Sequence, residues 1–113
     1  MSQEKRKFIR WSKKVRVICS FKENEEPFEE VFAEDISESG LQIVVSRFLE
    51  KAQVLKLKLE FGYDSIPINL TARVVYSITE GEKYRVGLEF VDVDEFQERR
   101  LRQCLEKFLK EPK

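Results

Sequence analysis

The stretch LKLKLEF, residues 55–61, alternates apolar and charged side chains without a break. Leu55, Leu57, Leu59 and Phe61 are separated by lysine or glutamate. Successive side chains of a β-strand point to opposite faces of the sheet, so this period of two predicts a strand with one buried and one solvated face.

The same alternation recurs in five other segments. They are residues 15–21, 31–33, 41–45, 66–76 and 84–90. Turn-forming residues separate the segments, at 24–27, 35–40, 62–65 and 80–82. Tight connections favour antiparallel pairing, because parallel neighbours need long crossovers. Six strands that each carry one apolar face bury those faces by curling up. The expected fold is mainly β, a six-stranded antiparallel β-barrel.

The last segment changes its period. Apolar residues recur there at intervals of three and four: Leu101, Cys104, Leu105 and Phe108. This spacing predicts a C-terminal amphipathic α-helix of about four turns. Asp92 and Asp94 are candidate N-caps, with Glu95 and Gln97 at capping-box spacing. The helix is expected to cover one end or side of the barrel.

Composition limits the function classes. The chain has 113 residues, enough for one small domain, and 21 basic residues balance 21 acidic ones. A formal net charge of zero gives no overall attraction to nucleic acid or membrane. There is no histidine, and neither Cys19 nor Cys104 belongs to a CxxC pair. The sequence also has no phosphate loop and no nucleophile elbow.

We therefore expect a protein that is not an enzyme and that holds no metal and no cofactor. Both cysteines are interpreted as reduced core residues. No apolar segment is long enough to span a bilayer or to act as a signal peptide, so we expect a cytoplasmic protein.

The N-terminal segment KRKFIRW, residues 5–11, places Arg6 and Arg10 four residues apart among aromatic and aliphatic side chains. An arginine guanidinium can hold a phosphate, or the O6/N7 edge of guanine, with two hydrogen bonds. The competing interpretation is a solvated basic tail, because short basic clusters are common.

The segment DISESG, residues 35–40, has more polar side chains than a hairpin turn requires. Asp35 and Ser37 are two residues apart and share a side of an extended segment, where a carboxylate can accept hydrogen bonds from guanine N1–H and N2–H. Gly40 allows a positive φ and a close approach of the backbone to a ligand. The competing interpretation is an Asx-type turn with a satisfied serine.

Together, RKFIR (residues 6–10) and DISESG (residues 35–40) resemble the RxxxR and [D/N]xSxxG signatures of the PilZ domain family of bacterial cyclic di-GMP receptors. VGLEF, residues 86–90, resembles the last barrel strand of that family. The resemblance extends over essentially the whole chain. It implies a PilZ-like barrel and a cyclic di-GMP site.

The resemblance also assigns roles to residues. Arg6 and Arg10 would bind phosphates and guanine edges, Asp35 and Ser37 would recognise a guanine, and Gly40 would shape the loop. Three further residues are candidates: Lys5, Trp11 and Tyr76. Lys5 stands where the family often has an arginine, which leaves open whether one or two cyclic di-GMP molecules bind. Tyr76 could stack on a base. Trp11 could either stack on guanine or pin the N-terminal segment to the barrel.

These features predict a mechanism. Residues 1–12 are expected to form a flexible arm and residues 13–113 the barrel with its helix. Ligand phosphates would order the arm across the barrel, and a separate effector in motility, secretion, polysaccharide or transcription machinery would read the new surface.

Two other functions stay open at this point. One is a protein-interaction domain with a degenerate pocket. The other is a small barrel that binds single-stranded nucleic acid, although zero net charge and the acidic stretch 23–38 argue against a nucleic acid polymer.

Overall fold

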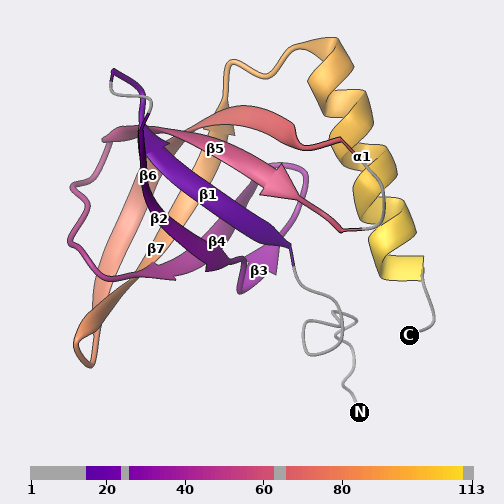
Figure 1. Ribbon diagram of the computed structural model, residues 1–113. Coiled ribbons are helices and arrows are strands. Elements are labelled where there is room, and N and C mark those ends of the chain that lie inside the picture. Colours follow the sequence, from indigo (N-terminus) through magenta and orange to yellow (C-terminus); the bar gives the residue numbers. More distant parts are fainter. Residues whose placement is uncertain (1–14, 24–25, 63–65, 111–113) are drawn as a thin grey trace.

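The computed structural model describes residues 15–23, 26–62 and 66–110, with side chains described as far as Lys107. Seven strands precede one helix (Figure 1). They are β1 (Arg16–Phe21), β2 (Pro27–Phe32), β3 (Asp35–Ile36), β4 (Gly40–Val45), β5 (Val54–Glu60), β6 (Ile68–Glu80), β7 (Lys83–Val91) and α1 (Glu95–Lys110).

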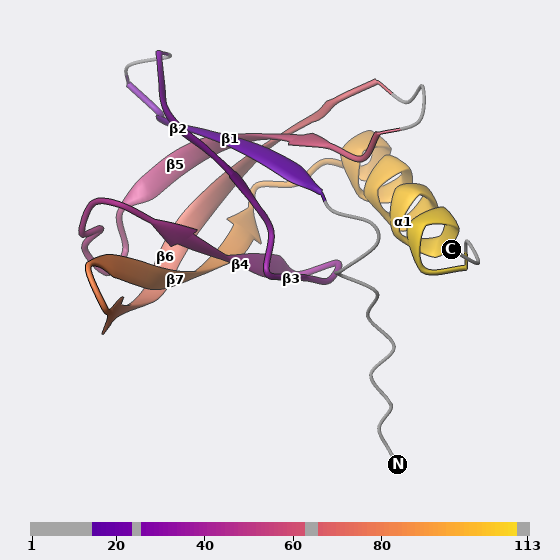
Figure 2. The same cartoon turned by 60° about the horizontal axis from the view of Figure 1, so that its bottom comes forward.

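All strands pair antiparallel in one curled sheet of order β2-β1-β5-β6-β7-β4-β3. Figure 2 shows the curl of the sheet. The curl brings β2 near β4, and there the Ser46 amide and hydroxyl both donate to the Glu29 carboxylate at 3.1 Å. The predicted mainly β, antiparallel architecture with a C-terminal helix is confirmed.

The predicted number of six strands is wrong by one. Within DISESG, Asp35 and Ile36 pair with Gln42 and Leu41 and form the short strand β3. Two residues are too few for alternation to reveal them in a sequence.

The core lies inside the curl and follows the predicted alternation. Leu55, Leu57 and Leu59 are at most 2% exposed, while Lys58 between them is exposed. The buried side chains of the neighbouring strands meet them there. Burial of these faces stabilises the curled sheet, since each apolar side chain removed from water contributes about 1.5–3 kcal/mol.

Helix α1 begins where the sequence predicts. Asp94 is the N-cap: its Oδ1 accepts the Gln97 backbone N–H at 2.7 Å, and Glu98 N donates to the Asp94 carbonyl at 2.9 Å. Leu101 and Leu105 are buried against the sheet. Arg100 is partly buried and donates to the Ile66 carbonyl at 2.6 Å.

Cys19 and Cys104 are both free thiols, and Cys19 is fully buried. Burial, followed by the nearby Glu29 charge, raises the pKa of the Cys19 thiol to about 12. The thiol is therefore neutral at physiological pH and acts as a small core residue.

Tyr76 departs from the predicted alternation. The segment 66–76 places it on the apolar face together with Val74, but the register shifts between Val74 and Tyr76. The extra residue, Val75, is a β-bulge, and one inserted residue moves the side chains that follow to the opposite face. Tyr76 accordingly lies on the outer face and is 36% exposed.

Candidate functional site

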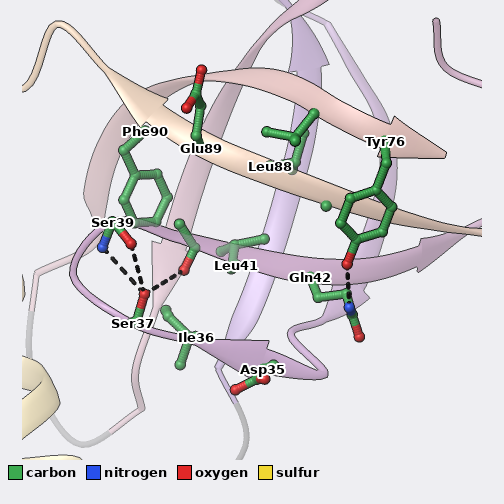
Figure 3. Close-up of a pocket in the computed structure, with 13 residues that line it drawn as sticks. Asp35, Ile36, Ser37, Ser39, Leu41, Gln42, Tyr76, Leu88, Glu89 and Phe90 are labelled. Atoms are coloured by element: carbon green, nitrogen blue, oxygen red, sulfur yellow. Dashed lines mark hydrogen bonds between the residues drawn. The ribbon is translucent and has the colours of Figure 1, made fainter. Parts of the chain in front are cut away.

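A pocket of about 470 Å³ lies on the outer face of β4, β6 and β7, beside β3 (Figure 3). Backbone or side-chain atoms of thirteen residues line it: Asp35, Ile36, Ser37, Ser39, Gly40, Leu41, Gln42, Val75, Tyr76, Gly87, Leu88, Glu89 and Phe90. Four of the residues singled out in the sequence, Asp35, Ser37, Gly40 and Tyr76, therefore meet at one place.

Asp35 lies on the short strand β3, at the edge of the sheet. Its side chain is exposed and has no hydrogen bond or ion pair to any described residue. A carboxylate without a partner can accept two hydrogen bonds from a ligand that offers adjacent N–H groups.

Ser37 organises the DISESG loop. Its backbone N–H donates to the Gly40 carbonyl at 2.9 Å, and its hydroxyl oxygen accepts the Ser39 N–H at 3.2 Å. The two serine hydroxyls are 3.1 Å apart (Figure 3). The hydrogen bonds of Ser37 are therefore satisfied within the loop, as expected if DISESG is only a turn. Ser37 also lines the pocket.

Gly40 allows a close approach of its backbone, but to the neighbouring strand β7 and not to a ligand. It pairs with Glu89 of β7, and a Cβ at Gly40 would lie 2.0 Å from the Leu88 carbonyl oxygen. Gly40 does not use the positive φ that a glycine allows: of the described glycines, those with positive φ are Gly62 and Gly81. Glycine is required here because β4 and β7 are in contact.

The sequence did not identify Gln42, Gly87 and Glu89 as part of the site. They share the outer face because Gln42 pairs with Gly87, and Gly40 with Glu89. The alternation within 41–45 and 84–90 predicts that these residues lie on the outer face. It does not show that they are neighbours, because that depends on the pairing register of β4 and β7.

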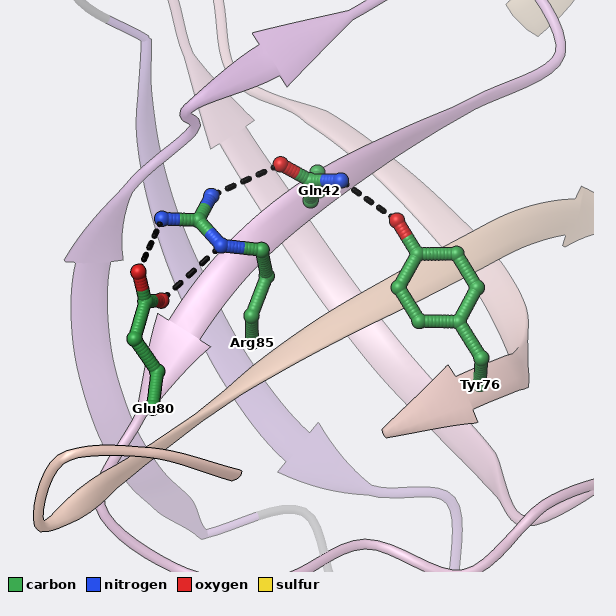
Figure 4. A network of polar contacts seen from close by, with 4 residues as sticks. All are labelled: Gln42, Tyr76, Glu80 and Arg85. Atoms are coloured by element: carbon green, nitrogen blue, oxygen red, sulfur yellow. Dashed lines mark hydrogen bonds and ion pairs between the residues drawn. The ribbon is translucent and has the colours of Figure 1, made fainter. Parts of the chain in front are cut away.

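A series of polar contacts links the Tyr76 hydroxyl, through Gln42, to Arg85 and Glu80 near the β6–β7 turn. Gln42 donates to the Tyr76 hydroxyl, Arg85 donates to Gln42 Oε1 at 2.8 Å, and Glu80 accepts two bonds from Arg85 (Figure 4). The hydrogen bond from Arg85 lowers the pKa of the Glu80 carboxyl, and the same bond raises the pKa of Arg85.

The pocket lining contains two carboxylates and no cation. Arg73, which is not in the lining, donates to Glu89 Oε2, with Nε at 2.8 Å, and so neutralises Glu89. Asp35 has no such ion-pair partner among the described residues. The described part of the pocket can therefore recognise hydrogen-bond donors but cannot by itself attract a dianion.

Arg6, Arg10, Lys5 and Trp11 lie outside the described residues, as does the proposed arm 1–12. Within residues 15–23, 26–62 and 66–110, no group of three or more potential metal-ligating side chains occurs. The helix in that part of the chain is not long and apolar enough to cross a bilayer.

This combination defines a class: a curled antiparallel sheet with a C-terminal helix and a polar pocket built around DISESG. The profile of the PilZ domain family matches residues 4–107. The chain belongs to the PilZ domain family.

Solved structures share this fold. The chain is similar to the inhibitor of motility MotI/DgrA from Bacillus subtilis (TM-score 0.63, 19% identity) and to MrkH from K. pneumonia in its apo state (0.70, 19%). The matches cover 88% and 97% of this chain. They span about half of the other two chains, 48% and 53%.

A third structure is the PilZ domain of YcgR from Escherichia coli with c-di-GMP. Its TM-score is 0.63 at 12% identity, over 87% of this chain and 82% of that one. At these identities the likeness establishes the fold. Comparison with curated proteins found no match.

Proposed function

We propose that this chain binds cyclic di-GMP in the pocket beside DISESG, and that the bound form is read by a separate effector. Asp35 accepts the N1–H and N2–H groups of one guanine, and Tyr76 faces a base. Arg6 and Arg10 bind the phosphates and a guanine edge.

One observation carries the proposal most. The Asp35 carboxylate, unpaired among described residues, and the exposed Tyr76 ring line the same pocket of about 470 Å³. An acceptor for the guanine edge and an aromatic face for its ring are the two elements that a guanine site needs. The PilZ structure of YcgR that contains c-di-GMP has the same fold.

The charge of the pocket supports a role for the N-terminal motif. Cyclic di-GMP carries two negative charges, and the described lining offers it no cation. Arg6 and Arg10 of RxxxR would supply that charge, each as a planar fork that fits a phosphate. The two motifs are thus complementary: one reads the base and the other holds the phosphates.

The same division of roles suggests how the signal leaves the protein. A ligand that joins residues 1–12 to the pocket orders them at the surface beside β3, and that surface differs between free and bound forms. Its reader would belong to motility, secretion, polysaccharide or transcription machinery. Localisation in the cytoplasm, where such a messenger would act, is part of this proposal.

Titration calorimetry tests the proposed ligand. Cyclic di-GMP is expected to bind with measurable heat. Cyclic di-AMP is the matched control, because it has the same phosphates but its adenine lacks the N1–H and N2–H donors that Asp35 would accept. We expect much weaker binding of cyclic di-AMP.

The alternatives give different results in the same series. A labelled single-stranded oligonucleotide that binds more tightly than cyclic di-GMP would favour the nucleic acid interpretation. Absence of heat with both dinucleotides at high micromolar concentration would contradict the receptor proposal and leave the interaction domain.

A further inference from the structure

Tyr76 reaches the pocket at a structural cost. The bulge at Val75 moves Tyr76 to the outer face and turns the next residue, Ser77, inward, opposite the buried Val86. The Ser77 hydroxyl is buried and has no hydrogen-bond partner among described residues. An unsatisfied buried hydroxyl is unfavourable, and bulges commonly serve to re-aim a side chain.

The Tyr76 ring rests on Gly87, its register partner on β7. A Cβ at Gly87 would lie 2.2, 2.5 and 2.8 Å from the ring atoms Cε2, Cζ and Cδ2. Three adjacent ring atoms at such similar distances place this Cβ over the ring face, because beyond the ring edge the outer two would be farther away. One face of the ring therefore lies on the strand backbone.

The hydroxyl end of Tyr76 is fixed by a chain of three side chains (Figure 4). An arginine has only donors, so the Arg85 contact at 2.8 Å requires Gln42 to turn its Oε1 toward the guanidinium. Gln42 Nε2 then faces Tyr76 and donates to its oxygen. The tyrosine proton remains available for an acceptor on a ligand.

Glu80 holds the other end of this chain. Its two carboxylate oxygens accept from Arg85 Nε and Nη2, both at 2.9 Å, which is the bidentate geometry that fixes a guanidinium best. Glu80 and Arg85 both belong to the β6–β7 hairpin, whereas Gln42 comes from β4. The ring orientation thus depends on residues outside the pocket.

We propose that four positioning residues hold the Tyr76 ring in the orientation in which a purine base stacks on it. They are Glu80, Arg85, Gln42 and Gly87. The inference rests on the proposed function, since the base is that of cyclic di-GMP. A preset ring loses little conformational freedom when the base stacks on it, and that favours binding.

A double-mutant cycle tests the proposal. Arg85→Met removes the clamp on Gln42 and keeps an apolar stem. We expect it to weaken cyclic di-GMP binding about fivefold, toward the loss caused by Tyr76→Leu, because stacking on an aromatic side chain contributes at least that factor. In the Tyr76→Leu background, Arg85→Met should change the affinity less than about twofold.

Arg16→Met is the matched control. Arg16 also bridges strands on the outer face, donating to Glu30 and Glu60 at 2.6 and 3.0 Å, and it is not in the pocket lining. It should leave the affinity unchanged. Equal losses from Arg85→Met in the wild-type and Tyr76→Leu backgrounds would refute a role through Tyr76.

Gly87→Ala provides a second, independent variant. The added methyl displaces the ring, so binding should weaken as in Tyr76→Leu, and the two changes should again be non-additive. Unchanged affinity in Gly87→Ala would contradict the proposal that Gly87 positions the Tyr76 ring. If the wild type does not bind cyclic di-GMP, the proposed function fails. If the wild type binds cyclic di-GMP but Arg85→Met leaves the affinity unchanged, only the positioning proposal fails.

Discussion

Replacing Asp35 by alanine is expected to weaken cyclic di-GMP binding by more than about tenfold. The carboxylate has no partner among described residues, so its loss removes only ligand contacts, and a hydrogen bond to a charged group contributes roughly 1.5–3 kcal/mol. For the same reason the melting curve of the free protein should stay nearly unchanged. Calorimetry and thermal unfolding measure the two effects.

Glu38→Ala is the control for charge. Glu38 lies in the same loop, does not line the pocket, and is 3.6 Å from Arg102. Removing either carboxylate should favour an anion on charge alone. A large loss in Asp35→Ala with no loss in Glu38→Ala therefore identifies a specific contact. Equal behaviour of the two variants would remove Asp35 from the site.

The Arg10→Ala variant tests the other half of the site. It should weaken binding by a factor similar to that of Asp35→Ala, because the described pocket has no cation that could replace the guanidinium. Unchanged affinity in both variants would refute the two-motif site.

Replacing Gly40 by alanine is expected to lower the free energy of unfolding by about 2 kcal/mol and to weaken binding. The new Cβ would lie 2.0 Å from the Leu88 carbonyl oxygen and 3.1 Å from Glu89 Cα. These are backbone atoms of a paired strand, so β4 and β7 must separate to relieve the overlap. The melting temperature should fall by roughly 5–10 °C.

Gly87→Ala is the comparison for this prediction. Its overlap is with the Tyr76 ring, which can move, so it should cost less stability than Gly40→Ala while still reducing affinity. A Gly40→Ala protein with the wild-type melting temperature would show that β4 and β7 are not in close contact at this point.

Much of the fold could be predicted from local patterns. LKLKLEF is a strand with its leucines buried, and Asp94 caps the helix, because alternation and capping depend on neighbours in sequence. The short strand β3 and the bulge at Val75 could not be predicted, since no residue type marks either of them.

The site divides in the same way. Asp35 and Ser37, which line the pocket, can be selected from the sequence because their spacing and motif are local. Gln42, Gly87 and Arg85 were missed, because their roles depend on the register between β4, β6 and β7. Tyr76 shows the difference most clearly: periodicity assigns it to the apolar face, and a single inserted residue moves it to the pocket.

The central claim is that cyclic di-GMP binds beside DISESG and joins the N-terminal segment to it. The most direct measurement is an amide NMR titration of the 113-residue chain with cyclic di-GMP. We expect the largest shift changes at residues 35–40, at 76 and 87–89, and within 5–11. Changes confined to other strands, or changes at 35–40 with none at 5–11, would contradict the two-motif site.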